Sequence, residues 1–187
     1  MGSQATTATA GGTGSESTAE AEAPASPPAA GRSRRRVWAQ QALETSWTES
    51  TIDLRLRKKD WKTHAFRFTP DLVEALGVRV AEDSAATGLN FTAAHYVDAA
   101  MATLLPATID EQMKLAEEFL RLMGARKIPE GKQSSYRVSP AVHDVAAPLS
   151  NHLKAAGRAR TAYHIYSAVL TKYLDQLRSE GPIKFGQ

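Results

Sequence analysis

The sequence predicts a mainly α-helical protein with a few short β-strands, preceded by a disordered tail. An internal repeat is the main reason, because the segment Ala65–Pro70 (AFRFTP) returns as Ser135–Pro140 (SYRVSP). Each copy alternates apolar and polar side chains, which is typical of a strand with one buried face. Each copy is followed by two stretches of helical composition that a glycine separates. The order strand, helix, tight turn, helix is therefore predicted twice.

The first 31 residues are almost entirely Ala, Ser, Thr, Gly, Pro and Glu. Such a segment buries too little apolar surface to offset its ordering entropy, so we expect it to be disordered. A basic cluster follows it, made of Arg32, Arg34, Arg35 and Arg36. The first 31 residues contain acids and no Lys or Arg, so the rest of the chain is more basic than the net charge of +3 implies. That charge fits a polyanion-binding protein and equally an ordinary soluble one.

Residues 37–62 are predicted to form an arm of one short helix and one strand. Val37–Leu43 has helical composition. Thr51–Arg57 alternates Ile, Leu and Leu with charged residues, and this period of two predicts a strand. The sequence alone gives this strand no clear role.

Helix-capping residues mark the elements of each repeat. Thr69 and Ser139 are good N-caps, each followed by a proline at the first helical position, where a missing N–H costs nothing. Gly88 and Gly157 suit the left-handed position that ends a helix. Thr92 and Thr161 are expected to cap the second helix of each copy, and the periodic apolar residues of those helices indicate one buried face.

The remaining segments complete a division into six parts. Thr108–Met123 has apolar residues on one face and predicts a connector helix ended by Gly124. Gly77 and Pro148 fall inside the first helix of their repeats and are expected to weaken or break it. The predicted parts are a tail (1–36), an arm (37–62), repeat 1 (63–106), a helical connector (107–132), repeat 2 (133–178) and a C-terminal tail (179–187).

Composition and motifs exclude several classes of protein. The chain has no cysteine, no apolar run long enough to span a bilayer and no signal-peptide pattern at its start, so we expect a soluble cytoplasmic protein. No nucleophile, base or phosphate-loop motif has the spacing that catalysis requires. We therefore predict no enzymatic activity, no cofactor and no metal site.

The repeated strand–helix–glycine turn–helix, with its Gly-x-x-x-Thr turns at Gly88–Thr92 and Gly157–Thr161, resembles the ribbon-helix-helix family of DNA-binding proteins (the MetJ, Arc and CopG type). The resemblance covers about half of the chain. It implies a tandem pseudo-dimer in which two strands form an antiparallel ribbon that enters the DNA major groove. We expect the strands 63–68 and 133–138 to pair within one chain, although pairing between chains is the alternative.

The resemblance also assigns site residues. The core-facing side chains of the two strands are expected to be Phe66, Phe68, Tyr136 and Val138. Alternation then turns outward the side chains that are expected to contact bases: Thr63, Ala65, Arg67, Gln133, Ser135 and Arg137. The two arginines are the sharpest candidates, because Arg bonds guanine O6 and N7 bidentately. In this family the start of the second helix binds phosphate. The corresponding residues are Asn90, Phe91, Thr92, Arg160 and Thr161, and each has an alternative interpretation as plain helix capping.

The implied function is sequence-specific binding of double-stranded DNA by a nucleoid- or plasmid-associated protein. The expected role is a plasmid-partition centromere-binding protein and/or a transcriptional repressor, with a relaxosome accessory protein or an antitoxin as alternatives. In a partition protein, Arg32, Arg34, Arg35 and Arg36 would act on a Walker-type ATPase. Otherwise they would contact DNA phosphates. Self-association on DNA is a further expectation, membrane binding is not expected, and a helical protein-interaction scaffold is the alternative from a different class.

Overall fold

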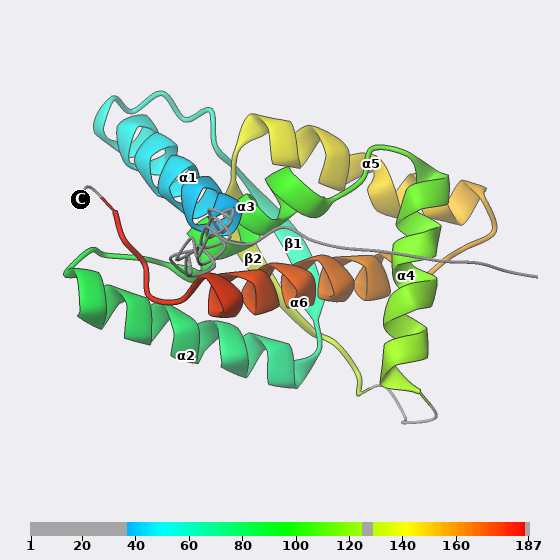
Figure 1. Ribbon diagram of the computed structural model, residues 1–187. Coiled ribbons are helices and arrows are strands. Elements are labelled where there is room, and N and C mark those ends of the chain that lie inside the picture. The colour runs from blue at the N-terminus through cyan, green and yellow to red at the C-terminus, as the bar shows by residue number, and fades with distance from the viewer. Residues whose placement is uncertain (1–36, 125–128, 186–187) are drawn as a thin grey trace, which may run out of the picture. The chain divides into compact units, whose positions relative to one another are not determined.

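The computed structural model describes residues 37–124 and 129–185, which form a mainly helical structure with one two-stranded antiparallel sheet (Figure 1). The elements in chain order are α1 (Trp38–Arg55), β1 (Lys62–Phe68), α2 (Pro70–Thr87), α3 (Ala93–Leu104), α4 (Ile109–Met123), β2 (Lys132–Val138), α5 (Pro140–Ala155) and α6 (Ala162–Glu180). None of these helices is long and apolar enough to cross a membrane.

The two strands of the repeat pair with each other within the chain. Their antiparallel register places Ala65 opposite Ser135, Thr63 opposite Arg137 and Arg67 opposite Gln133. Since the repeat matches Ala65 with Ser135, the register is symmetric about this central pair. Intramolecular pairing, which the sequence left open against pairing between chains, is therefore what this structure contains.

Alternation along the strands separates a buried face from an exposed face. Phe66, Phe68, Tyr136 and Val138 are buried, as the sequence pattern predicts. Each side chain of this size contributes about 1.5–3 kcal/mol when it leaves water. Because these four side chains pack into the core, the side chains that alternate with them lie on the opposite face of the sheet.

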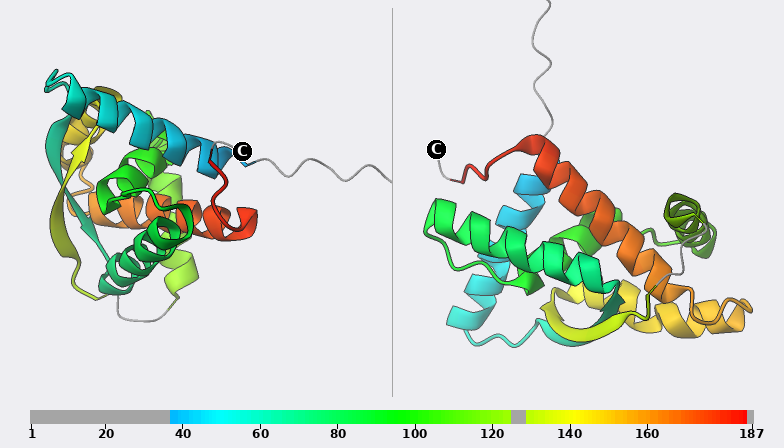
Figure 2. Two further views of the ribbon diagram at one scale, coloured as in Figure 1. Left: turned by 90° about the vertical axis from the view of Figure 1, so that its left-hand side faces the viewer. Right: turned by 90° about the horizontal axis from the view of Figure 1, so that it is seen from below.

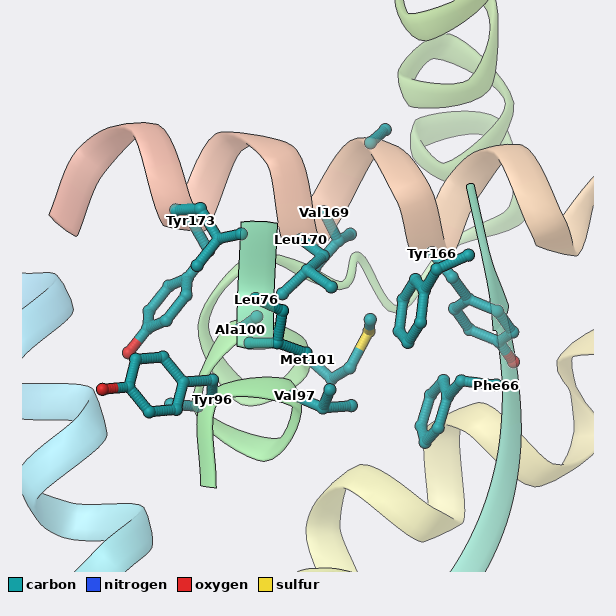
Figure 3. Close-up of a cluster of buried hydrophobic side chains, with 14 of the residues drawn as sticks. Phe66, Leu76, Tyr96, Val97, Ala100, Met101, Tyr166, Val169, Leu170 and Tyr173 are labelled. Carbon is teal, nitrogen blue, oxygen red and sulfur yellow. The ribbon is translucent and has the colours of Figure 1, made fainter. Parts of the chain in front are cut away.

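The core forms between the two repeats. The second helix of each repeat packs on the strand of the other repeat, because α3 contacts β2 and α6 contacts β1. Side chains from both repeats meet at the centre, where Tyr96 of α3 lies beside Tyr173 of α6, and Tyr166 of α6 packs against Phe66 of β1 with ring centroids 4.9 Å apart (Figure 3). Neither repeat is large enough to bury such a core alone.

The predicted turns and helix starts are confirmed, but of the predicted capping side chains only Thr92 makes a capping hydrogen bond, whereas Thr69, Ser139 and Thr161 make none. Thr69 and Ser139 precede helices that begin at Pro70 and Pro140. Gly88 and Gly157 have φ of 72° and 71°, the left-handed conformation that glycine adopts without a steric penalty. The tight turns between the two helices of each repeat therefore lie where the sequence placed them.

The predicted strand at 51–57 is wrong, because α1 continues to Arg55. The alternating apolar residues Ile52, Leu54 and Leu56 are exposed, by 45%, 60% and 62%. The buried face of this part of α1 instead carries Ser50 and Asp53, at helical spacing. The alternation of apolar and charged residues at 51–57 does not correspond to a buried face, and therefore it did not indicate a strand.

The helices α1 and α4, which precede β1 and β2, occupy equivalent positions relative to the two repeats. α1 packs against α3 and α4 packs against α6, so each leading helix covers the second helix of its own repeat. The segment interpreted as a connector therefore also belongs to the packed core. The start of α1 is held by the Glu180 carboxylate, which accepts hydrogen bonds from the N–H groups of Ala39 (3.0 Å) and Gln40 (2.9 Å). A carboxylate at this position also interacts favourably with the helix dipole.

Gly77 and Pro148 do not break their helices. α2 runs through Gly77, and α5 runs without interruption from Pro140 to Ala155 with Pro148 inside it. Leu149 and Leu153, which follow the proline, are each only 1% exposed. Burial of this second half of α5 offsets the hydrogen bond that proline is unable to make.

Candidate functional site

The exposed face of the β1–β2 sheet is the candidate site. All helices except the end of α1 lie on the other side of the sheet, which forms one edge of the described structure (Figure 2). The face consists of three cross-strand pairs: Thr63 with Arg137, Ala65 with Ser135, and Arg67 with Gln133. Five of the six side chains are exposed, and Arg137 is partly buried. The structure thus brings together all six residues predicted to contact bases.

Arg67 stands at one end of this face with a neutral partner. Its Nη2 donates a hydrogen bond to Gln133 Oε1, the residue directly opposite, at 3.2 Å. Gly131 lies against the stem of the Arg67 side chain, and a Cβ added there would come within 2.5 Å of both Arg67 Cγ and a ring carbon of Tyr163. Only glycine fits between these two side chains, so Gly131 helps to set the position of Arg67.

Arg137 stands at the other end and has a charged partner. Its Nη2 donates to Oδ2 of Asp53, near the end of α1. The Asp53 side chain is 5% exposed and that of Arg137 is 30% exposed. The two arginines occupy equivalent positions in the repeat, but only Arg137 is held by a carboxylate.

The start of α6 adjoins the Arg67 end of the sheet. A cleft of about 700 Å³ lies between them, lined by Arg67, Gln133, Arg160, Tyr163 and, as its one acid, Glu130. The Tyr163 hydroxyl donates a hydrogen bond to the Pro129 carbonyl (2.8 Å), which connects the start of α6 to the segment before β2. Arg160 is exposed, and Thr161 precedes the first residue of α6. The first amides of a helix lack intrahelical acceptors, so an anion is favoured here.

The start of α3, its counterpart in repeat 1, is less open. Asn90 and Thr92 are exposed, but Phe91 is 4% exposed and packs against Trp47 and Phe185. The Phe91 N–H already donates to Leu89 O (3.1 Å) and Ser84 Oγ (3.3 Å). Phe91 therefore has neither a side chain nor a free N–H to offer a phosphate.

The Thr92 N–H is also engaged, because it donates to Nδ1 of His95 at 3.1 Å. His95 is 7% exposed, and burial lowers its pKa from 6.5 to about 4. A neutral imidazole is required here, since a protonated Nδ1 would be unable to accept the Thr92 hydrogen bond. His95 is thus a buried helix-capping residue.

Several residues at the site were not found by sequence reasoning. Asp53, Gly131 and Tyr163 each contact one of the two arginines or lie beside them. Sequence reasoning offered no reason to select Asp53, because the segment 51–57 that contains it was wrongly predicted to be a strand. The basic cluster Arg32, Arg34, Arg35 and Arg36 lies outside the described residues.

The chemistry of this face is that of a hydrogen-bonding surface. Arg67, Gln133, Ser135 and Thr63 present donors and acceptors side by side on a rigid two-stranded support. Comparisons of the chain with protein-family models, with curated proteins and with solved structures give no match. Function is therefore inferred from this geometry.

Proposed function

We propose that this protein binds double-stranded DNA sequence-specifically, with the exposed face of the β1–β2 sheet in the major groove. The two repeats would act together as a tandem ribbon-helix-helix pair on one chain. The observation that carries the proposal is the strand register, which gathers Arg67, Gln133, Ser135, Thr63 and Arg137 on one exposed face. A two-stranded ribbon fits the width of the major groove.

The side chains on this face suit base recognition. Arginine bonds guanine bidentately, glutamine does the same with adenine, and serine or threonine bonds several bases. The face has a small residue at its centre, since Ala65 lies opposite Ser135. A small centre lets the backbone of the ribbon approach the floor of the groove while the longer side chains at both ends reach the base edges.

Phosphate contacts would fix the ribbon in the groove. At the Arg67 end, Arg160 and Thr161 stand at the start of α6, beside the cleft that borders the sheet. In repeat 1 the exposed residues at the corresponding turn, before α3, are Asn90 and Thr92. Contacts of this kind position a protein on the duplex and carry no sequence information themselves.

We further propose a partition or repressor role, with relaxosome or antitoxin roles as the alternatives. The support is the sequence of the N-terminal segment, in which a long stretch without large apolar residues precedes Arg32–Arg36. An arginine on such a segment is able to reach a transferring phosphate in a partner ATPase. Association of several chains along adjacent sites is the expected form of self-assembly.

A binding titration tests the proposed function. Fluorescence anisotropy with labelled random duplex DNA at 50 and 200 mM salt should show binding that weakens steeply with salt, because DNA binding releases condensed counterions. Addition of an excess of single-stranded competitor should displace little of the protein. Absence of binding at 50 mM salt would contradict the proposal and favour a helical protein-interaction scaffold.

A further inference from the structure

The loop between α1 and β1 is strongly basic. Residues 55–62, which we call the basic loop, carry the exposed cations Arg55, Arg57, Lys58, Lys59 and Lys62. Asp60 is the one exposed acid in this range. The corresponding segment before β2, residues 125–132, has three cations in its sequence against five in the basic loop.

The basic loop is attached to the end of the sheet by Asp53. The Asp53 carboxylate accepts a hydrogen bond from the Asp60 N–H at 2.9 Å and, through its other oxygen, one from the Arg137 guanidinium. The Asp53 carbonyl accepts a hydrogen bond from the Lys58 N–H at 3.2 Å. Since Asp53 is only 4% exposed, it holds the loop and the exposed face of the sheet in one fixed arrangement.

The backbone of the basic loop is unusual. Among the described residues other than glycine, those with positive φ are Arg57 (51°), Lys59 (59°) and Arg160 (72°). All three carry a positive charge, and each belongs to a segment that borders one end of the β1–β2 sheet. Backbone conformations that L residues rarely adopt persist where the surrounding structure imposes them, and they concentrate at binding sites.

Comparison of the repeats shows what the basic loop replaces. Repeat 2 has Arg158 and Arg160 before α6, where repeat 1 has Leu89 and Phe91 before α3. Phe91 is buried and Leu89 is uncharged, so the start of α3 presents no cation where repeat 2 has Arg158 and Arg160. The basic loop supplies positive charge at the Arg137 end of the sheet, to which Asp53 attaches it.

We propose that the basic loop is a phosphate-binding site for the backbone of double-stranded DNA, beside the groove that the Arg137 end of the sheet enters. This inference rests on the proposed DNA-binding function and adds a contact surface to it. Arg160 and the start of α6 contact the DNA backbone on one side of the groove, and the basic loop contacts the backbone on the other side. The two flanks use different elements, so one chain binds its site in a single direction.

Charge removal tests the proposal. The loop variant Lys58→Gln/Lys59→Gln removes two exposed cations and leaves the Asp53 contacts in place. The matched control, Arg178→Gln/Lys184→Gln, removes two exposed cations at the end of α6 and in the segment after it, away from the sheet (Figure 2). Both variants and the unmodified protein are titrated with random duplex DNA from 50 to 200 mM salt. Circular dichroism confirms that both variants are folded.

The loop variant should bind about tenfold more weakly at 100 mM salt, and its plot of log affinity against log salt should be less steep by about 1–2, since each phosphate contact contributes about 0.9 to this slope. The control should bind as the unmodified protein does. A loop variant with the affinity and slope of the control would overturn this inference alone. Failure of the unmodified protein to bind DNA would overturn both this inference and the proposed function.

Discussion

The carboxylate of Asp53 near the end of α1 accepts a hydrogen bond from the guanidinium of Arg137 in β2, although 84 positions separate the two residues in the chain. Arg67, which the repeat places at the equivalent position, bonds only the neutral side chain of Gln133 among the described residues. A symmetric strand register thus carries two arginines in unlike surroundings. Their replacement should have unlike consequences.

Arg67→Ala should lower affinity for the specific site by about 1–3 kcal/mol and leave binding to random DNA nearly unchanged, because a base contact is lost. Its stability should stay the same, since Arg67 is exposed. Titrations with specific and random duplexes, together with urea denaturation, measure both quantities. Equal losses on the two duplexes would mean that Arg67 contacts phosphate.

Arg137→Ala should lower specific affinity by a similar amount, about 1–3 kcal/mol. It should also reduce the free energy of unfolding by about 1–3 kcal/mol, because it leaves the buried Asp53 carboxylate without its cation. The comparison with Arg67→Ala in the same urea denaturation series isolates this second effect. Unchanged stability of Arg137→Ala would contradict a structural role for the ion pair.

Asp53→Asn should free Arg137 while keeping an oxygen that accepts the Asp60 N–H. The variant loses a negative charge beside the proposed DNA surface, so binding at low salt should become tighter, while stability falls by about 1 kcal/mol. Asp53→Ala, which loses both contacts, is the comparison for stability. Weaker DNA binding by a stably folded Asp53→Asn would show instead that Asp53 orients Arg137 for base contact.

The buried His95 makes stability depend on pH. Its pKa is about 4 in the folded protein against 6.5 when unperturbed, so the unfolded chain takes up a proton first as pH falls. The free energy of unfolding should therefore decrease as pH falls from about 6.5 to about 4, by roughly 2–3 kcal/mol. His95→Gln keeps an acceptor at the third helical position and should flatten this part of the profile. Parallel profiles for both proteins would assign the pH dependence to other groups.

The sequence predicted the repeat units because local signals determine them. Alternation, the caps before Pro70 and Pro140, and the left-handed positions of Gly88 and Gly157 all depend on nearby residues. The side chains on the exposed face followed from alternation once the buried residues were known.

Long-range contacts were beyond sequence reasoning. The length of α1 depends on packing against α3 and on Glu180 at its start, far away in the chain. The Asp53–Arg137 contact depends in turn on where α1 ends. Local alternation at 51–57 gave the wrong element because no neighbouring strand or core surface covers its apolar residues.

Deletion of residues 1–36 should leave the recognized DNA sequence unchanged, since the proposed base contacts all lie in the sheet. If the protein acts in partition, the deletion should abolish stimulation of its partner ATPase, measured as phosphate release. If the deletion only weakens DNA binding and flattens its salt dependence, Arg32–Arg36 contact phosphates and the repressor or relaxosome roles gain support.

The central claim, that the β1–β2 sheet reads DNA sequence, is tested most directly by selection from a random duplex library. The intact protein should enrich one short motif over successive rounds, and Arg67→Ala should enrich a motif that has lost its preference for guanine at one position. A pool that stays random with the intact protein, or a motif that is identical for the intact protein and for the double variant Arg67→Ala/Arg137→Ala, would contradict the account.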